Sequence, residues 1–128
     1  MQDLNHKHIL VSASGLRKPP QTAEDLDAWL RRLVDKVGMK ILMGPFSIRC
    51  DTIGNEGVTG VCCIETSHCS VHVWSECESP FLKMDLYSCK DFDPLDVYRM
   101  IKEFRPFETS WIVIDRNGNQ AGMIPIMR

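Results

Sequence analysis

The chain has 128 residues, 44% of them hydrophobic and 25% charged, with a formal net charge of −2 at pH 7. These values are typical of a single soluble globular domain, which we place at residues 1–128. With no basic run and no apolar run near the ~20 residues of a membrane span, nucleic-acid and membrane functions are excluded. Residues 1–6 do not have the features of a signal peptide, so we expect a cytoplasmic protein.

The cysteines are expected to be free thiols, because no secretory signal accompanies them and no two have the CxxC spacing. Cys62 and Cys63 are adjacent in an apparent strand, so they point to its opposite faces and act as small hydrophobic residues. The others are Cys50, Cys69, Cys77 and Cys89. Only Cys89 is a functional candidate.

The first third of the chain predicts a strand followed by an amphipathic helix. Residues 8–13 (HILVSA) form a short apolar run that favours a strand. Thr22 is suited to be a helix N-cap, and Gly38 ends the pattern that follows it. Between them, apolar residues recur at helical spacing: Leu26, Trp29, Leu30, Leu33, Val34 and Val37.

The middle third predicts several strands in succession. Residues 39–43 favour a second strand that Gly44-Pro45 breaks, and residues 48–51 continue the sheet. A loop at residues 54–57 follows. The next expected strands are residues 58–66, 69–74 and 83–88.

The last third predicts a helix and a closing hairpin. Asp93-Pro94 combines an N-cap with a first-turn proline, and the helix extends to about Phe104. Residues 109–114 and 121–126 form the hairpin around Asn117-Gly118. The inward residues of this helix are expected to be Val97, Tyr98, Ile101 and Phe104.

This order of elements predicts an α+β fold. Two helices are too few to cover both faces of a parallel sheet. We therefore expect a two-layer α/β sandwich, with one mainly antiparallel sheet and two helices on one face. The uncovered face or edge of such a sheet favours a homodimer.

A polar cluster lies at residues 65–72 (ETSHCSVH), and the residues alone allow three interpretations. A metal site would need His68 and His72, which lie ~13 Å apart on a strand, too far to share an ion, so we expect no metal. A Ser–His or Cys–His hydrolase would need a nucleophile elbow, and no such glycine pattern surrounds Ser67. On composition alone, polar residues that only satisfy backbone groups are the favoured interpretation.

Three motifs alter that balance: GVTG at residues 57–60, SHCSVHVWSE at residues 67–76 and DLYSC at residues 85–89. Their order and spacing resemble the short prokaryotic pyruvoyl-dependent S-adenosylmethionine decarboxylases. The likeness covers residues 57–104 closely, and the rest of the chain in the order of its elements.

The resemblance implies a role for individual residues. Ser67 matches the serine that becomes the pyruvoyl cofactor, so self-cleavage is expected between Thr66 and Ser67. Thr59 matches a processing serine that stabilises the intermediate, and His72 matches a histidine that assists self-cleavage. Cys89 matches the cysteine proposed as catalytic acid.

The implied chemistry suits these residue types. The Ser67 hydroxyl attacks the Thr66 carbonyl and converts the amide into an ester, which requires a base and an oxyanion donor. Elimination at Ser67 then leaves dehydroalanine, which water hydrolyses to the pyruvoyl group with loss of ammonia. Its carbonyl forms a Schiff base with an amine and accepts electrons as carbon dioxide leaves. Cys89 would return a proton to the α-carbon.

Two substrate-binding positions follow from the same resemblance. Glu76 matches a carboxylate placed to bind substrate. Ile53 stands where the family tends to carry an aromatic residue that stacks on adenine, a contact worth about 1–3 kcal/mol. Phe46 or Phe81 could compensate. A further departure is Thr66, where the family usually has glutamate.

The leading hypothesis is a decarboxylase of S-adenosylmethionine that supplies the aminopropyl donor for spermidine synthesis, acting as a homodimer of cleaved protomers with active sites near the interface. Ile53 motivates an alternative, a pyruvoyl-dependent decarboxylase of ornithine or arginine. Thr66 motivates a third, an unprocessed non-catalytic homologue.

Overall fold

A computed structural model describes residues 4–118 and, as backbone in the sheet, residues 122–126. The described residues form a seven-stranded sheet in the order β2-β3-β4-β5-β1-β6-β7, with every neighbouring pair antiparallel. The elements, in chain order, are β1 (Lys7–Ser14), α1 (Ala23–Lys36), β2 (Ile41–Cys50), β3 (Gly57–Ile64), β4 (Ser67–Trp74), β5 (Phe81–Ser88), α2 (Pro94–Ile101), the 3₁₀ turn η1 (Lys102–Phe104), β6 (Glu108–Asp115) and β7 (Gly122–Ile126).

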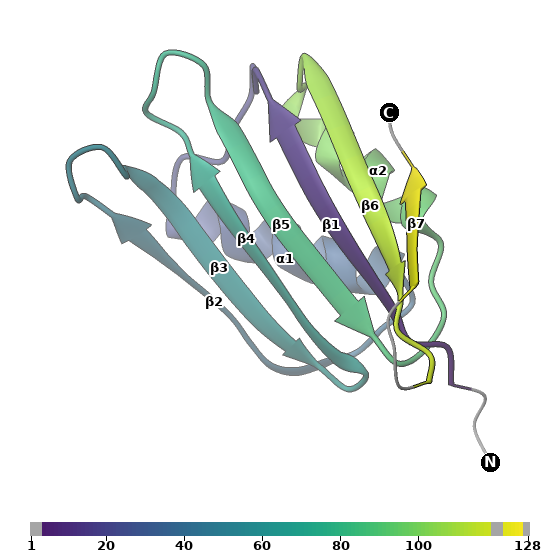
Figure 1. Cartoon of the computed structure of the whole chain (residues 1–128). Helices are drawn as coiled ribbons and strands as arrows, with labels where there is room; N and C mark the ends of the chain where they lie inside the picture. Colours follow the sequence, from purple (N-terminus) through teal and green to yellow (C-terminus); the bar gives the residue numbers. More distant parts are fainter. Residues whose placement is uncertain (1–3, 119–121, 127–128) are drawn as a thin grey trace.

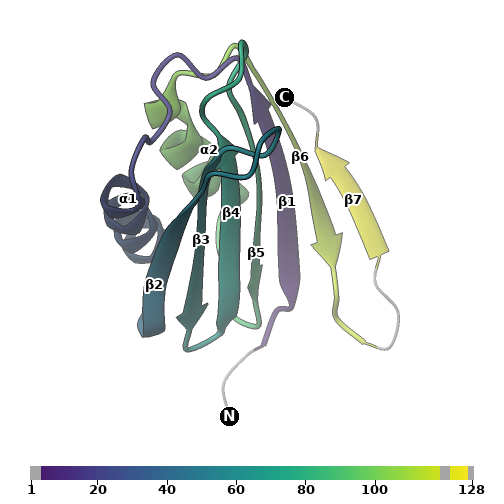
Figure 2. The same ribbon diagram turned by 90° about the vertical axis from the view of Figure 1, so that its left-hand side faces the viewer.

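Both helices cover the same face of the sheet, and the other face is open (Figures 1 and 2). The core lies between the helices and the sheet, where Trp29 and Trp111 are among its largest fully buried side chains. The Trp29 indole joins the two helices by donating a hydrogen bond of 3.1 Å to the Met100 carbonyl. The expected α+β sandwich is confirmed.

Helix α1 forms where its local signals indicate. The Thr22 hydroxyl accepts a hydrogen bond from the Asp25 N–H, and Gly38 follows the helix with φ of +77°. The predicted apolar stripe is buried along its whole length. The second helix is shorter than expected, because α2 ends at Ile101 and η1 carries the chain to Phe104.

The break predicted at Gly44-Pro45 is wrong. Strand β2 continues through this dipeptide, with register shifts against β3 between Ile41 and Met43 and between Met43 and Phe46. β2 is an edge strand with β3 as its one neighbour, so the N–H that proline lacks is not needed for a hydrogen bond to a second strand. The predicted break is therefore an irregularity within one strand.

The strand pairing β6–β7 agrees with the expected closing hairpin. Residues 119–121 lie outside the described residues, so the turn expected after Asn117-Gly118 is not described. Among the described residues, no helix is long and apolar enough to cross a membrane.

The open face carries both polar and apolar side chains. Register places His68, Ser70 and His72 of β4 on this face, because Cys69, Val71 and Val73 alternate with them and are buried under the helices. Among the described residues, exposed apolar side chains also share the open face, including Leu10, Met43, Phe46, Ile48 and Val61.

Candidate active site

The Thr66–Ser67 bond lies in the tight turn between β3 and β4. Ile64 pairs with Ser67, so Glu65 and Thr66 are the two turn residues. Ser67 has φ of +149°, a region that is nearly restricted to glycine and costs a residue with a side chain about 1–3 kcal/mol. Ser67, the residue expected to cut the chain, therefore has a strained φ torsion.

The end of β5 lies against this turn. Ser67 pairs with Ser88, and the N–H of Cys89 donates a hydrogen bond of 2.9 Å to the Thr66 carbonyl oxygen. This oxygen becomes negatively charged when a nucleophile attacks the carbonyl carbon, so the Cys89 N–H is positioned as an oxyanion donor. The structure thus brings together Thr66, Ser67 and Cys89, three of the residues selected from the sequence.

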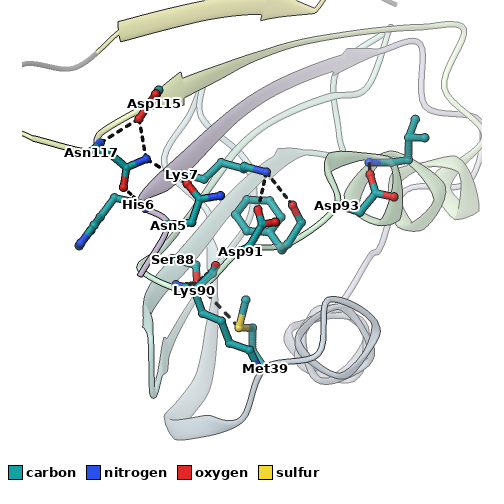
Figure 3. Close-up of polar contacts among 12 residues, drawn as sticks. Asn5, His6, Lys7, Met39, Ser88, Lys90, Asp91, Asp93, Asp115 and Asn117 are labelled. Atoms are coloured by element: carbon teal, nitrogen blue, oxygen red, sulfur yellow. Dashed lines mark hydrogen bonds and ion pairs between the residues drawn. The ribbon is translucent and has the colours of Figure 1, made fainter. Parts of the chain in front are cut away.

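Ser88 contacts the turn through Thr66, and the sequence analysis did not select it as a site residue. Its side chain is fully buried, with Oγ 3.0 Å from Thr66 Oγ1 and 2.7 Å from the Lys90 carbonyl oxygen. The Lys90 N–H donates back to Ser88 Oγ at 3.0 Å, and Met39 Sδ lies 3.2 Å from Thr66 Oγ1 (Figure 3 shows Ser88, Lys90 and Met39). These contacts fix the side chain of Thr66, which stands at the position where the family usually has glutamate.

Hydrogen bonds connect the segment that carries Cys89 to residues at the start of β1. The Asn5 N–H donates to the Cys89 carbonyl at 2.9 Å. Lys7 Nζ donates to Asp91 Oδ1 at 2.7 Å and to the Phe92 carbonyl at 3.0 Å (Figure 3). The hydrogen bond from Lys7 lowers the pKa of the Asp91 carboxyl. Cys89 itself is half-buried and its thiol is free.

His68 makes a contact with Ser67 that the sequence analysis did not foresee. Its Nδ1 lies 3.0 Å from Ser67 Oγ, and its Nε2 lies 3.6 Å from Asp85 Oδ2. His8 Nε2 is 2.8 Å from the same carboxylate oxygen, and Ser70 donates to the other one. Sequence reasoning named His68 only in the metal hypothesis and gave it no part in self-cleavage.

His8, His68 and Asp85 also form a group whose ligand atoms lie within 4.8 Å of one another. Two ligands of a tetrahedral zinc ion are about 3.4 Å apart, given bonds near 2.1 Å. The 2.8 Å between His8 Nε2 and Asp85 Oδ2 is instead a hydrogen-bond distance. The group therefore fits a hydrogen-bonded cluster better than a metal centre.

Thr59 and His72 form a second pair on the open face. Thr59 Oγ1 is 2.5 Å from His72 Nδ1, and the His72 ring lies on Trp74 with centroids 4.0 Å apart. Burial lowers the pKa of His72, and its Nε2 has no hydrogen-bond partner among the described residues. Ser67 is five positions away on the same strand, or about 16 Å. Within one chain, this pair does not reach Ser67.

A hollow of about 460 Å³ opens on the same face. Thr59, His72, Lys83 and Asp85 are among the residues that line it. Its volume lies in the range of small-molecule sites.

The expected substrate-binding residues lie at the opposite end of the sheet from Ser67. Glu76 follows β4 and forms an ion pair with Arg49 of β2. Ile53 is 93% exposed in the β2–β3 loop. Of the two possible substitutes for an aromatic at position 53, Phe81 stacks on Trp74 with centroids 4.5 Å apart, and Phe46 is exposed on the edge strand.

A model of the family described as S-adenosylmethionine decarboxylase matches residues 7–117. The chain therefore belongs to this family of carboxy-lyases.

Among curated proteins, the chain is similar to the S-adenosylmethionine decarboxylase proenzyme of Archaeoglobus fulgidus, with 24% identity over 112 residues, covering 86% of this chain and 96% of the relative. Among solved structures, its fold is similar to that of the adenosylmethionine decarboxylase from Aquifex aeolicus, with a TM-score of 0.68 and 23% identity, covering 93% of this chain and 100% of the other.

Proposed function

We propose that this chain is a proenzyme that cuts itself between Thr66 and Ser67. The Ser67 side then becomes the pyruvoyl group with which the enzyme decarboxylates S-adenosylmethionine for spermidine synthesis. One observation carries the proposal beyond family membership. The Thr66 carbonyl accepts the Cys89 N–H at 2.9 Å, and it precedes a serine held at φ of +149°. A hydroxyl nucleophile, a polarised carbonyl and a strained peptide unit thus coincide at one bond.

The residues around Ser67 fit the cofactor. The groups that react in cleavage are the Ser67 hydroxyl and the Thr66 carbonyl, and elimination leaves Thr66 with a free carboxylate. Ser88 and Lys90 hold the Thr66 side in place while this happens. A pyruvoyl carbonyl supplies an electron sink for the loss of carbon dioxide.

Cys89 is the proposed catalytic acid. It follows Ser88, which pairs directly with Ser67, so its thiol lies on the segment next to the reacting position. The contacts of Asn5 and Lys7 described above hold this segment. A positioned acid that returns a proton to the substrate carbon commonly contributes about 10²–10⁴-fold to the rate.

We also propose that the active unit is a homodimer that buries the open face. The exposed apolar residues of this face favour burial against a second copy. A two-fold axis between the two sheets, crossing the strands midway between Ser67 and His72, would place Thr59 and His72 of the partner subunit opposite Ser67. The ~16 Å gap within one chain supports this arrangement, because it leaves the pair without a role at its own Ser67.

The substrate is then held between the two subunits. The hollow that contains Thr59 and His72 would face the Ser67 turn of the other chain. The same two-fold operation would bring Glu76 of the partner subunit toward that end of the sheet. A carboxylate there can accept hydrogen bonds from ribose hydroxyls, and the stacked pair Trp74 and Phe81 offers an aromatic surface to adenine.

The test measures labelled carbon dioxide from S-adenosylmethionine, ornithine, arginine and lysine in parallel. Intact mass spectrometry of the same sample should show two fragments divided between Thr66 and Ser67. Ser67→Ala should abolish both cleavage and carbon dioxide release, and Ser14→Ala, at the exposed end of β1, should change neither. Release from an amino acid but not from S-adenosylmethionine would overturn the proposed substrate.

A further inference from the structure

We propose that His68 is the general base that takes the Ser67 hydroxyl proton during self-cleavage, and that Asp85 positions it. This inference rests on the proposed function, since it assigns a residue to its first step. His72 is separated from Ser67 of its own chain by about 16 Å and cannot take this role in cis.

The geometry at Ser67 selects His68. Successive side chains of a regular strand point to opposite faces, which would separate neighbours such as Ser67 and His68. At the start of β4 the chain departs from this regularity, because Ser67 has a positive φ, and its Oγ lies 3.0 Å from His68 Nδ1. Among the described residues, no other side-chain atom is hydrogen-bonded to Ser67 Oγ.

The environment of the ring suits a base that becomes charged. Once His68 holds the proton, its imidazolium has Asp85 Oδ2 at 3.6 Å from Nε2, within ion-pair range. Ser70 and His8 hold the two oxygens of this carboxylate from neighbouring strands. Asp85 is thus fixed before the reaction starts.

Tyr87 limits the movement of the histidines. Its ring centroid lies 6.0 Å from that of His68 and 5.6 Å from that of His8. Since His68 is half-exposed, with 50% of its side-chain surface accessible, its contacts with Ser67, Asp85, His8 and Tyr87 are what orient it. The ring is therefore oriented by tertiary neighbours rather than by burial.

The step balances without any outside reagent. The Ser67 O–H bond breaks as its proton passes to His68 Nδ1, and Oγ forms a bond to the Thr66 carbonyl carbon. The charge on the carbonyl oxygen is met by the Cys89 N–H. The C–N bond to Ser67 then breaks, His68 returns the proton to the Ser67 amine, and an ester remains.

The first experiment follows cleavage of the full chain over time during cell-free synthesis, by gel and intact mass. His68→Ala and His68→Gln should each cut about 10²–10⁴-fold more slowly than the parent. Added imidazole should restore much of the rate to the alanine variant, which a purely structural role of His68 would not allow. The matched control is His6→Gln, because His6 contacts Tyr87 but not Ser67, and it should cut at the parent rate.

The second experiment changes the nucleophile. A thiol ionises far more readily than a hydroxyl, so it depends less on a base. Adding His68→Ala to Ser67→Cys should therefore slow formation of the thioester much less than His68→Ala slows the parent. Hydroxylamine, which cleaves esters and thioesters, should not cut the His68→Ala chain, because that variant is blocked before the ester forms.

The positioning role of Asp85 needs its own readout. Asp85→Asn should slow cleavage in the parent and have little further effect when His68 is already alanine, because Asp85 acts through His68. Asp85→Glu should recover part of the loss. Equal effects of Asp85→Asn in both backgrounds would mean that it only stabilises the sheet.

The outcomes separate this inference from the proposed function. If His68→Ala cuts at the parent rate and the product decarboxylates S-adenosylmethionine, His68 is not the base and the function stands. Accumulation of a hydroxylamine-sensitive ester in His68→Ala would place His68 after the first step and overturn the inference. If the parent chain is never cut, the proposed function itself fails.

Discussion

The N–H of Cys89 donates a hydrogen bond of 2.9 Å to the carbonyl oxygen of Thr66, the oxygen that would gain charge in the proposed attack by the Ser67 hydroxyl. The thiol and the N–H of Cys89 thus have separable roles. The backbone group is proposed to act in self-cleavage, and the side chain is proposed to act in decarboxylation afterwards.

Cys89→Ala should therefore still cut itself, because alanine keeps the N–H. Its release of carbon dioxide from S-adenosylmethionine should fall by about 10²–10⁴-fold, since the proton donor is lost. Intact mass and labelled carbon dioxide measure the two steps on one sample. Cys77→Ala, an exposed cysteine beyond the far end of β4, is the control and should keep both. If Cys89→Ala turns over at the parent rate, the thiol is only a packing residue.

A mixed dimer should distinguish action within one chain from action between chains. Ser67→Ala and His72→Ala are each expected to be defective, because one lacks the nucleophile and the other its helper. Co-folded in equal amounts, they should recover about a quarter of the parent cleavage sites, since half of the dimers are mixed and each holds one complete site. Differently tagged chains identify the cut species by mass. If His72→Ala stays uncut both alone and in the mixture, His72 works on its own Ser67; if His72→Ala is cut by itself, His72 has no role in self-cleavage.

A charge placed on the open face should dissociate the dimer. Val61 is exposed there and lies across from Ser70, so Val61→Glu places a carboxylate in the proposed interface without touching the helix-covered core. Sedimentation at micromolar concentration should show a dimer for the parent and a monomer with little activity for the variant. Leu95→Glu, on the exposed side of α2 in the helix layer that covers the other face, should leave the dimer intact. An active parent monomer would contradict the dimer proposal.

Removal of the Ser88 hydroxyl should weaken the fold and slow cleavage. Ser88→Ala leaves Thr66 Oγ1 and the Lys90 N–H without their buried partner, which costs about 1–3 kcal/mol of unfolding free energy. Urea unfolding in an uncut Ser67→Ala background measures the cost, and a cleavage time course measures the effect on the turn. Ser14→Ala in the same background should cost far less. Equal stability of the two variants would show that the buried contacts contribute nothing.

The stability of the chain should fall as the pH drops through the range where an ordinary histidine gains a proton. Burial lowers the pKa of His72, so the unfolded chain binds the proton first, near its ordinary pKa of about 6.5. Protonation therefore favours the unfolded chain at low pH, and the contribution returns as the pH rises. Urea unfolding of uncut Ser67→Ala at pH 5.5 and 7.5 should show a larger loss than the same protein with His72→Gln. Identical losses would rule out His72 as the source.

Local signals accounted for the parts of the fold that depend on neighbours in sequence. Thr22 and Gly38 delimit α1 because capping is decided by a few adjacent residues. Gly44-Pro45 was misjudged because its effect depends on β2 being at the edge of the sheet, which no local pattern reveals. Edge position is a property of the complete strand order.

The candidate site divides in the same way. Ser67 and Cys89 stood out through their motifs, and the turn brings them together. Ser88 and Asp85 could not be selected, because their roles come from the register between β4 and β5. His68 was dismissed with the metal hypothesis, although a histidine directly after the reactive serine was a signal that it could serve another purpose.

The strand order has a consequence for the cleaved protein. A cut at Ser67 would leave β1, β2 and β3 on one fragment and β4 to β7 on the other, yet β1 lies between β5 and β6. The fragments would share three hydrogen-bonded ladders: β3 with β4, β1 with β5 and β1 with β6. One fragment contributes a strand between two strands of the other, so the fragments could separate only if all three ladders broke. The scission would change the connectivity of the chain while its architecture stays whole.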